Sequence, residues 1–184
     1  MGSRRLEVPR GRWVAAVVMG LAMGLGGLGW SGTVGAQGRA PRSSLHVQHR
    51  GPRLPVVGNA RDLKREPVVH ATKGRPPTKL EMKNLVVGKG KTAKDSSTVS
   101  VMYVGASYRT GKDFTSTTWK ERHPTTFPLN EVVPGFRRGL IGMKVGGRRE
   151  IVIPPKLGYG DRSTGPIKAD ETLVFVVDLK GVSG

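Results

Sequence analysis

From about Lys79 to the C-terminus, apolar and polar residues alternate in short runs that are typical of half-buried strands. In the clearest run, residues 98–108, a spacing of two residues places Val99, Val101 and Tyr103 on one face. The segments that this pattern predicts as strands are 80–87, 98–108, 127–129, 149–155 and 172–179.

Residues 134–143 depart from this alternation and have the spacing of a helix, with apolar side chains at Phe136, Leu140 and Met143. Pro134 stands near the start, where a helix tolerates proline because the missing N–H would have no partner there. Several strands and one short helix predict an α+β domain over residues 79–184, in which an antiparallel sheet wraps the helix.

Residues 37–78 follow neither period. Clusters such as R-G-P-R-L-P and K-G-R-P-P-T interrupt the chain with Pro, Gly and scattered charge. Such a segment buries too little apolar surface to offset the entropy lost on ordering, so it is predicted to be a flexible tether. Asp62-Leu63 and Pro67-Val68-Val69 are the parts of it that could dock on the domain.

Residues 1–36 have the composition of an export signal. Basic residues precede an uncharged apolar stretch, residues 13–30, and Val34-Gly35-Ala36 then offers the small residues that a signal peptidase requires. The apolar stretch is rich in Gly and long for a signal core, so an uncleaved membrane anchor is the alternative. In both cases we expect the protein to be exported and to act outside the cytoplasm.

The charge of the chain is strongly basic, with 31 Lys and Arg against 13 Asp and Glu, or +18. Residues 37–83 hold eleven basic and three acidic residues, a net charge of 11 − 3 = +8. This density is compatible either with attraction to an acidic polymer or with a solvated basic linker. No aromatic residue lies between these charges to stack on bases, so no specific nucleic-acid partner is expected.

Residues able to perform acid–base, metal or thiol chemistry are sparse. The chain has no Cys and four His, and no His, Asp and Glu residues stand at metal-ligand spacing. A nucleophile motif of the G-x-S-x-G kind is also missing. The sequence therefore predicts no metal and no cofactor, and any function must come from apolar and aromatic side chains.

Such side chains occur in an ordered series of motifs: V-M-Y-V-G (101–105), T-G-K-D-F (110–114), F-P-L-N-E-V-V-P-G-F (127–136), G-L-I-G-M-K-V-G-G-R-R-E (139–150), I-P-P-K-L-G-Y-G (153–160) and T-L-V-F-V-V-D-L (172–179). Together, over about residues 79–182, they resemble the FKBP-type peptidyl-prolyl cis-trans isomerases, in the form found in bacteria. The resemblance implies a half-barrel of about five antiparallel strands around one short helix, with the active site in an apolar pocket between helix and sheet.

The resemblance also implies roles for individual residues. Tyr103 matches the pocket tyrosine of the first long strand, and Phe114 matches the phenylalanine of the pocket wall. Val133 matches the aliphatic residue whose backbone N–H receives a substrate carbonyl. Phe136 stands at the pocket floor, where many members have tryptophan.

Three further positions complete the implied site. Tyr159 matches the tyrosine whose hydroxyl faces the substrate, Ile167 the aliphatic residue of the long loop, and Phe175 the phenylalanine of the last strand. The expected substrates are proline-containing segments of exported polypeptides, with a macrolide as a second ligand of the same pocket. The protein is expected to be a monomer.

Some positions depart from the family pattern. Thr115 stands where the family usually has an aspartate near the twisting bond, and Thr125 replaces a phenylalanine. Lys168 and Ala169 replace prolines of the long loop. These differences leave two functions open: an isomerase of reduced activity, or a binding module or chaperone that keeps the fold and isomerises little.

Overall fold

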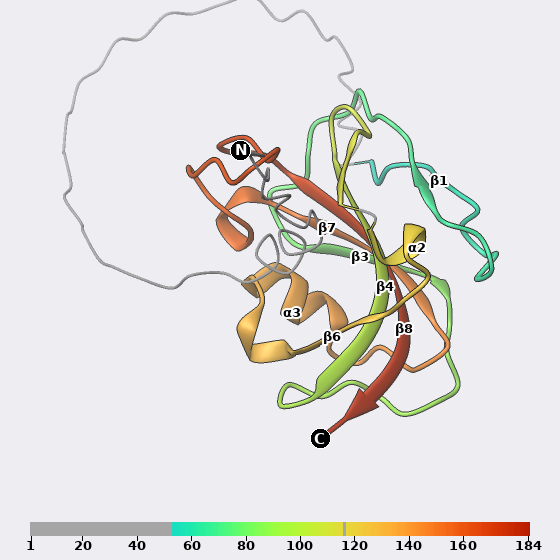
Figure 1. The fold of residues 1–184 in the computed structure, drawn as a ribbon. Coiled ribbons are helices and arrows are strands. Elements are labelled where there is room, and N and C mark those ends of the chain that lie inside the picture. The colour runs from blue at the N-terminus through green and yellow to red at the C-terminus, as the bar shows by residue number, and fades with distance from the viewer. Residues whose placement is uncertain (1–52, 116) are drawn as a thin grey trace, which may run out of the picture. The chain divides into compact units, whose positions relative to one another are not determined.

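The computed structural model describes residues 53–115 and 117–184 (Figure 1). The expected export signal and residues 37–52 of the expected tether lie outside the described residues. No helix within the described part of the chain is both long and apolar enough to cross a bilayer.

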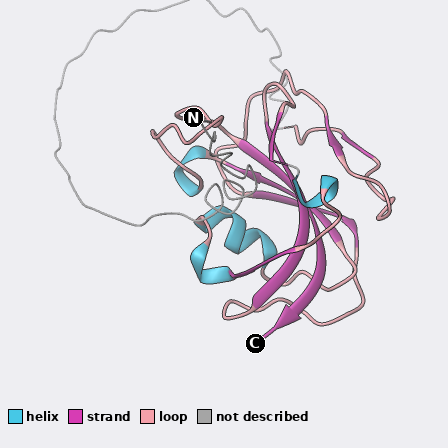
Figure 2. Cartoon of the chain, viewed as in Figure 1, coloured by secondary structure: helices cyan, strands magenta, loops and turns pink. Residues whose placement is uncertain are grey.

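The centre of the fold is an antiparallel sheet in the order β3-β7-β8-β4-β5, with β6 also paired to β4 (Figures 1 and 2). Its strands are β3 (Glu81–Val86), β4 (Thr98–Ser107), β5 (Asp113–Thr115), β6 (Thr125–Pro128), β7 (Arg148–Ile153) and β8 (Leu173–Ser183). β4 pairs along its length with β8, and its other edge is shared by β6 and β5. The α+β antiparallel architecture expected from the sequence is confirmed; the short strand β5 was not among the predicted segments.

The longest helix among the described residues, α3 (Pro134–Leu140), lies against one face of this sheet (Figure 1). It ends three residues before the predicted boundary because Ile141, with a ψ of 134°, is no longer helical and Gly142 has a φ of 78°, which glycine adopts without strain. Arg149 of β7 holds this helix end: one Nη donates to the carbonyl oxygens of Gly139 at 2.7 Å and Ile141 at 3.2 Å. Shorter elements are α2 (Thr117–Lys120), η1 (Leu129–Glu131) and η2 (Pro155–Leu157).

The two faces of the sheet carry separate apolar clusters, as the alternation of side chains along each strand requires. The face toward α3, called the inner face here, includes Tyr103, Ile151 and Phe175. The outer face carries a smaller cluster that includes Val152 and Val174. Neighbouring residues of β7 and β8 therefore belong to different cores, and each face needs a cover.

Residues 53–78, called the strap here, cover the outer face. Within the strap, β1 (Val57–Gly58) pairs with β2 (Val68–Val69), and Val69 is 4% exposed against the outer cluster. The hydroxyl of Tyr108 donates to the strap at the carbonyl oxygens of Arg53 (2.7 Å) and Arg75 (3.1 Å). The flexible tether predicted for residues 37–78 is therefore wrong for the part described, because the outer face supplies apolar surface that the local sequence lacks.

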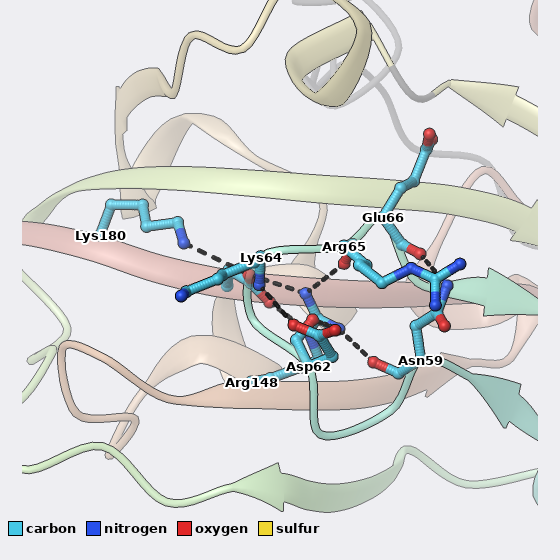
Figure 3. A network of polar contacts seen from close by, with 8 residues as sticks. Asn59, Asp62, Lys64, Arg65, Glu66, Arg148 and Lys180 are labelled. Atoms are coloured by element: carbon cyan, nitrogen blue, oxygen red, sulfur yellow. Dashed lines mark hydrogen bonds and ion pairs between the residues drawn. The ribbon is translucent and has the colours of Figure 1, made fainter.

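A buried arginine fixes the strap to the sheet (Figure 3). Arg148 of β7 lies opposite Asp178 of β8 and donates to its carboxylate from Nε at 2.5 Å and Nη2 at 2.9 Å. The remaining donors reach three strap carbonyl oxygens: those of Asn59 at 2.6 Å, Asp62 at 3.0 Å and Arg65 at 3.1 Å. Arg148 is fully buried, so the strap supplies the hydrogen bonds that water would otherwise supply.

Candidate active site

The inner face gathers five aromatic rings between α3 and the sheet. Phe136 of α3 lies centrally, with ring centroids 4.8 Å from Phe175 and 6.0 Å from both Tyr103 and Phe127. Phe114 of β5 meets Phe175 edge-on at 5.7 Å. All of these pairs are tilted or T-shaped, and aromatic quadrupoles favour such edge-to-face contacts.

Strand register explains how rings distant in sequence come together. Gly105 of β4 lies opposite Phe175 of β8 on one side and Thr115 of β5 on the other. A Cβ at Gly105 would lie 2.6 Å from a ring carbon of Phe114 and 2.8 Å from one of Phe175. The missing side chain of this glycine makes the space in which the two rings pack.

Two tyrosine hydroxyls lie in this apolar surrounding. Burial raises the pKa of Tyr103 to about 12, and a contact with the Thr115 hydroxyl acts weakly in the opposite direction. Burial also raises the pKa of Tyr159, with a smaller effect from Tyr103 nearby. Both phenols therefore stay protonated, and able to donate, throughout the physiological pH range.

One hydroxyl of the site has no hydrogen-bond partner. The Tyr159 hydroxyl is buried and finds no partner among the described residues. Buried polar groups are usually satisfied, because an unmet donor costs about 1–3 kcal/mol. A ligand carbonyl that accepts from Tyr159 would recover that cost.

The structure brings the residues implied by the resemblance together. Those buried in the inner cluster are Tyr103, Val133, Phe136, Ile167 and Phe175. Phe114 and Tyr159 pack against it half-buried. Thr115, 7% exposed, joins it beside Tyr103.

Local structure sets the positions of two aliphatic members. Val133 is the N-cap of α3, and its carbonyl accepts from the N–H groups of Phe136 and Arg137. Ile167 is held by a tight loop in which it exchanges two backbone hydrogen bonds with Thr164, at 2.9 and 3.0 Å.

The candidate set from the sequence missed Phe127. This ring is buried against Phe136, on the same side of β6 as the half-buried Thr125. The sequence did contain a signal for Phe127: it stands two residues after Thr125, and residues at that spacing in a strand lie on the same face. Phe127 therefore covers part of the side that Thr125 leaves open.

Charged groups take no part in this cluster. Its members are aromatic, aliphatic or hydroxylic, and within the described ranges no three His, Asp or Glu side chains gather at metal-binding distance. The arrangement can enclose an apolar group and donate a hydrogen bond to a neighbouring carbonyl. It offers binding and orientation, and it uses no group that gains or loses a proton near neutral pH.

Comparisons with known proteins agree with this geometry. The sequence profile of the family described as FKBP-type peptidyl-prolyl cis-trans isomerase matches residues 89–180. A probable FK506-binding protein of Corynebacterium glutamicum is 39% identical over 114 residues, which are 62% of this chain and 96% of the relative. An FK506-binding protein of Streptomyces anulatus is 44% identical over 121 residues, 64% of this chain and 97% of the relative.

A solved structure shows the same fold. The crystal structure of FkpA from Escherichia coli aligns with a TM-score of 0.54 at 38% identity, covering 59% of this chain and 51% of that one. The family profile begins at residue 89, so the strap and β3 lie outside the matched region.

Proposed function

This chain belongs to the FKBP-type peptidyl-prolyl cis-trans isomerase family, and we propose that its inner aromatic cluster catalyses the isomerisation of X-Pro peptide bonds in exported polypeptides. The relatives support the isomerase over a binding module that keeps the fold without the activity. The assignment of the site rests on the packing of Phe136, Phe175 and Tyr103 in one cluster with Tyr159, whose hydroxyl has no hydrogen-bond partner among the described residues.

The reaction requires no bond to break and no proton to move. Rotation about the X-Pro amide has a barrier of about 20 kcal/mol because the C–N bond loses its conjugation on the way. A site accelerates the rotation if it binds the twisted amide better than either planar form. The planar amide is the more polar form, so an apolar enclosure disfavours it relative to the twisted one.

We assign the residues accordingly. The proline ring of the substrate lies on Phe136, flanked by Tyr103 and Phe175, and Phe114 forms the wall of the site. Tyr159 donates to a substrate carbonyl and, with the backbone N–H of Val133, fixes the orientation of the peptide. Ile167 covers the substrate from the loop side. We further propose that the protein acts as a monomer, since one chain supplies every residue assigned to the site.

Thr115 sets the strength of catalysis in this proposal. A carboxylate at this position would place a negative charge beside the Tyr103 hydroxyl and near the rotating bond. Thr115 offers a neutral hydroxyl instead, which removes an electrostatic contribution of about 1–3 kcal/mol. The expected consequence is a rate roughly ten- to a hundred-fold below that of a carboxylate-bearing site.

An assay of cis-to-trans isomerisation with a short X-Pro peptide tests the function. We expect the purified full chain to exceed the uncatalysed rate, and Tyr159→Phe to lower kcat/KM about ten-fold because the donor is lost. Thr115→Asp should raise kcat/KM. Thr115→Asn, which introduces a side chain of the same shape as Asp but without its charge, should not. Two relatives are named as FK506-binding proteins, so we expect FK506 to compete with the peptide for the site.

Two results would together decide for the binding module. They are a folded wild-type chain whose rate equals background, and a folded Thr115→Asp variant that stays at background as well. Peptide binding without turnover would then assign the aromatic cluster to recognition alone.

We further propose that the protein is exported, on the basis of the basic start, the apolar stretch 13–30 and Val34-Gly35-Ala36. N-terminal sequencing of the protein from its native host should give Gln37 or a near neighbour. An intact Met1 in the membrane fraction would indicate an anchor instead. Intact Met1 in the cytoplasmic fraction would refute export.

A further inference from the structure

The short helix α2 joins the wall of the active site to the outer face of the sheet. It begins at Thr117, two residues after Thr115, and it carries Trp119. The indole of Trp119 lies over the guanidinium of Arg148, whose Cζ is 5.4 Å from the ring centroid. The Nζ of Lys180 lies on the same ring at 6.0 Å. Trp119 therefore packs on the polar group that also fastens the strap.

Arg148 is a rigid platform for that indole. Its in-plane donors are occupied by the carboxylate of Asp178 and by the strap carbonyls of Asn59, Asp62 and Arg65 (Figure 3). A guanidinium held at its edges has only its flat faces free, and aromatic rings are attracted to such faces, more strongly where water is excluded. The position of Trp119 thus depends on the completeness of the Arg148 network.

The strand β5 also has contacts of its own with the sheet, among them that of Thr115 with Tyr103. β5 is three residues long, and its two ladder pairs with β4 are Gly105–Thr115 and Ala106–Asp113, with an irregular register between them. On the inner face, Phe114 is held by its edge contact with Phe175. Phe114 therefore anchors β5 on the inner face, and Trp119 anchors α2 on Arg148.

We propose that Trp119 and Arg148 are positioning residues for the isomerase site: the stacked pair holds the β5–α2 segment that presents Phe114 and Thr115 to the substrate. The inference rests on the proposed function of Phe114 and Thr115. It follows that the strap contributes to activity indirectly, because its carbonyl oxygens accept the hydrogen bonds that keep Arg148 in place.

Variants of Trp119 in the full chain test the proposal. Trp119→Leu keeps an apolar group but removes the attraction to the guanidinium, and we expect kcat/KM per folded molecule to fall roughly five- to twenty-fold, chiefly through KM. Trp119→Phe restores an aromatic ring and should retain most of the activity. Lys180→Met, the matched control, removes the more distant cation, leaves Arg148 in place and should leave kcat/KM unchanged.

A spectroscopic measurement separates positioning from stability. In protein labelled with 5-fluorotryptophan, the Trp119 resonance is identified by its loss in Trp119→Phe. Saturation with an X-Pro peptide should shift this resonance, although the substituted ring lies on the face of the sheet opposite the site. Wild-type turnover tests the proposed function by itself, whereas the ratio between variants and the fluorine shift test the positioning role.

The proposal is overturned if Trp119→Leu matches the wild type in kcat and KM per folded molecule. It is equally overturned if Trp119→Phe loses as much activity as Trp119→Leu, or if peptide saturation leaves the Trp119 resonance unmoved. An activity loss confined to Trp119→Leu, together with a fluorine shift, supports it.

Discussion

Replacing Arg148 with methionine is expected to lower the Tm of the protein by about 10–20 °C, the largest effect of any single polar substitution considered. The change leaves the carboxylate of Asp178 buried, with Lys180 at 3.4 Å as its remaining cation. It also leaves the strap carbonyls without their donor. Removing one partner of a buried, hydrogen-bonded ion pair costs about 3–5 kcal/mol, because the other charge stays desolvated.

The chain offers a matched control in a second arginine–aspartate pair. Arg137 and Asp95 also form a two-pronged contact, but their side chains are 37% and 61% exposed to solvent. Solvent screens that pair, so Arg137→Met should change the Tm by no more than about 2 °C. Equal losses in the two variants would contradict the argument from burial.

A double variant separates the ion pair from the strap. Arg148→Met with Asp178→Leu removes both charges, so the penalty for a lone buried carboxylate disappears. The strap carbonyls still lack a donor, and only part of the lost stability should return. Full recovery in thermal denaturation would show that these carbonyls contribute nothing.

Gly139→Ala is expected to reduce both stability and isomerase activity. An added Cβ would lie 2.6 Å and 2.7 Å from two side-chain carbons of Ile151, so α3 would have to move away from β7. Overpacking of this kind costs about 1–3 kcal/mol, whereas the better helix propensity of alanine recovers at most about 1 kcal/mol. The overpacking outweighs the gain in propensity. Phe136 moves with the helix, so kcat/KM should fall about ten-fold or more.

The control for this prediction is Gly74→Ala in the strap. A Cβ there would have its nearest neighbours at 3.6 Å, an ordinary contact distance. Denaturation curves and the peptide assay should show Gly74→Ala near the wild type. A Gly139→Ala variant with wild-type activity would mean that the separation of α3 and β7 does not determine the position of Phe136.

The strands and the helix were predictable because their signals are local. Alternation in residues 98–108 placed Val99, Val101 and Tyr103 on one face, and all three are buried in the inner cluster. The ends of the elements were less predictable. Helix α3 ends at Leu140 because the backbone angles of Ile141 and Gly142 are not helical. Met143, taken as the last helical residue, is buried in the same cluster from the turn beyond it.

The strap was not predictable from its own residues. Its composition is that of a linker, and Val69 is buried in a cluster that includes Val152, Val174 and Val176 of the sheet. The pairing of Arg148 with Asp178 depends on the register of β7 and β8, which no local pattern states. The sequence showed that these strands contain charges; it did not show that the charges are buried together.

From the sequence by itself, the resemblance to the family implied the side chains of the proposed site, among them Tyr103, Phe136 and Phe175, and the structure places these three in one cluster. Only the tertiary structure showed what covers the opposite, outer face of the sheet. Burial is a property of what lies across the sheet, and contacts such as Arg148 with the strap join residues more than 80 positions apart. Free energies of desolvation depend on that covering, so the role of a charged residue within a strand emerges only when the chain has folded over it.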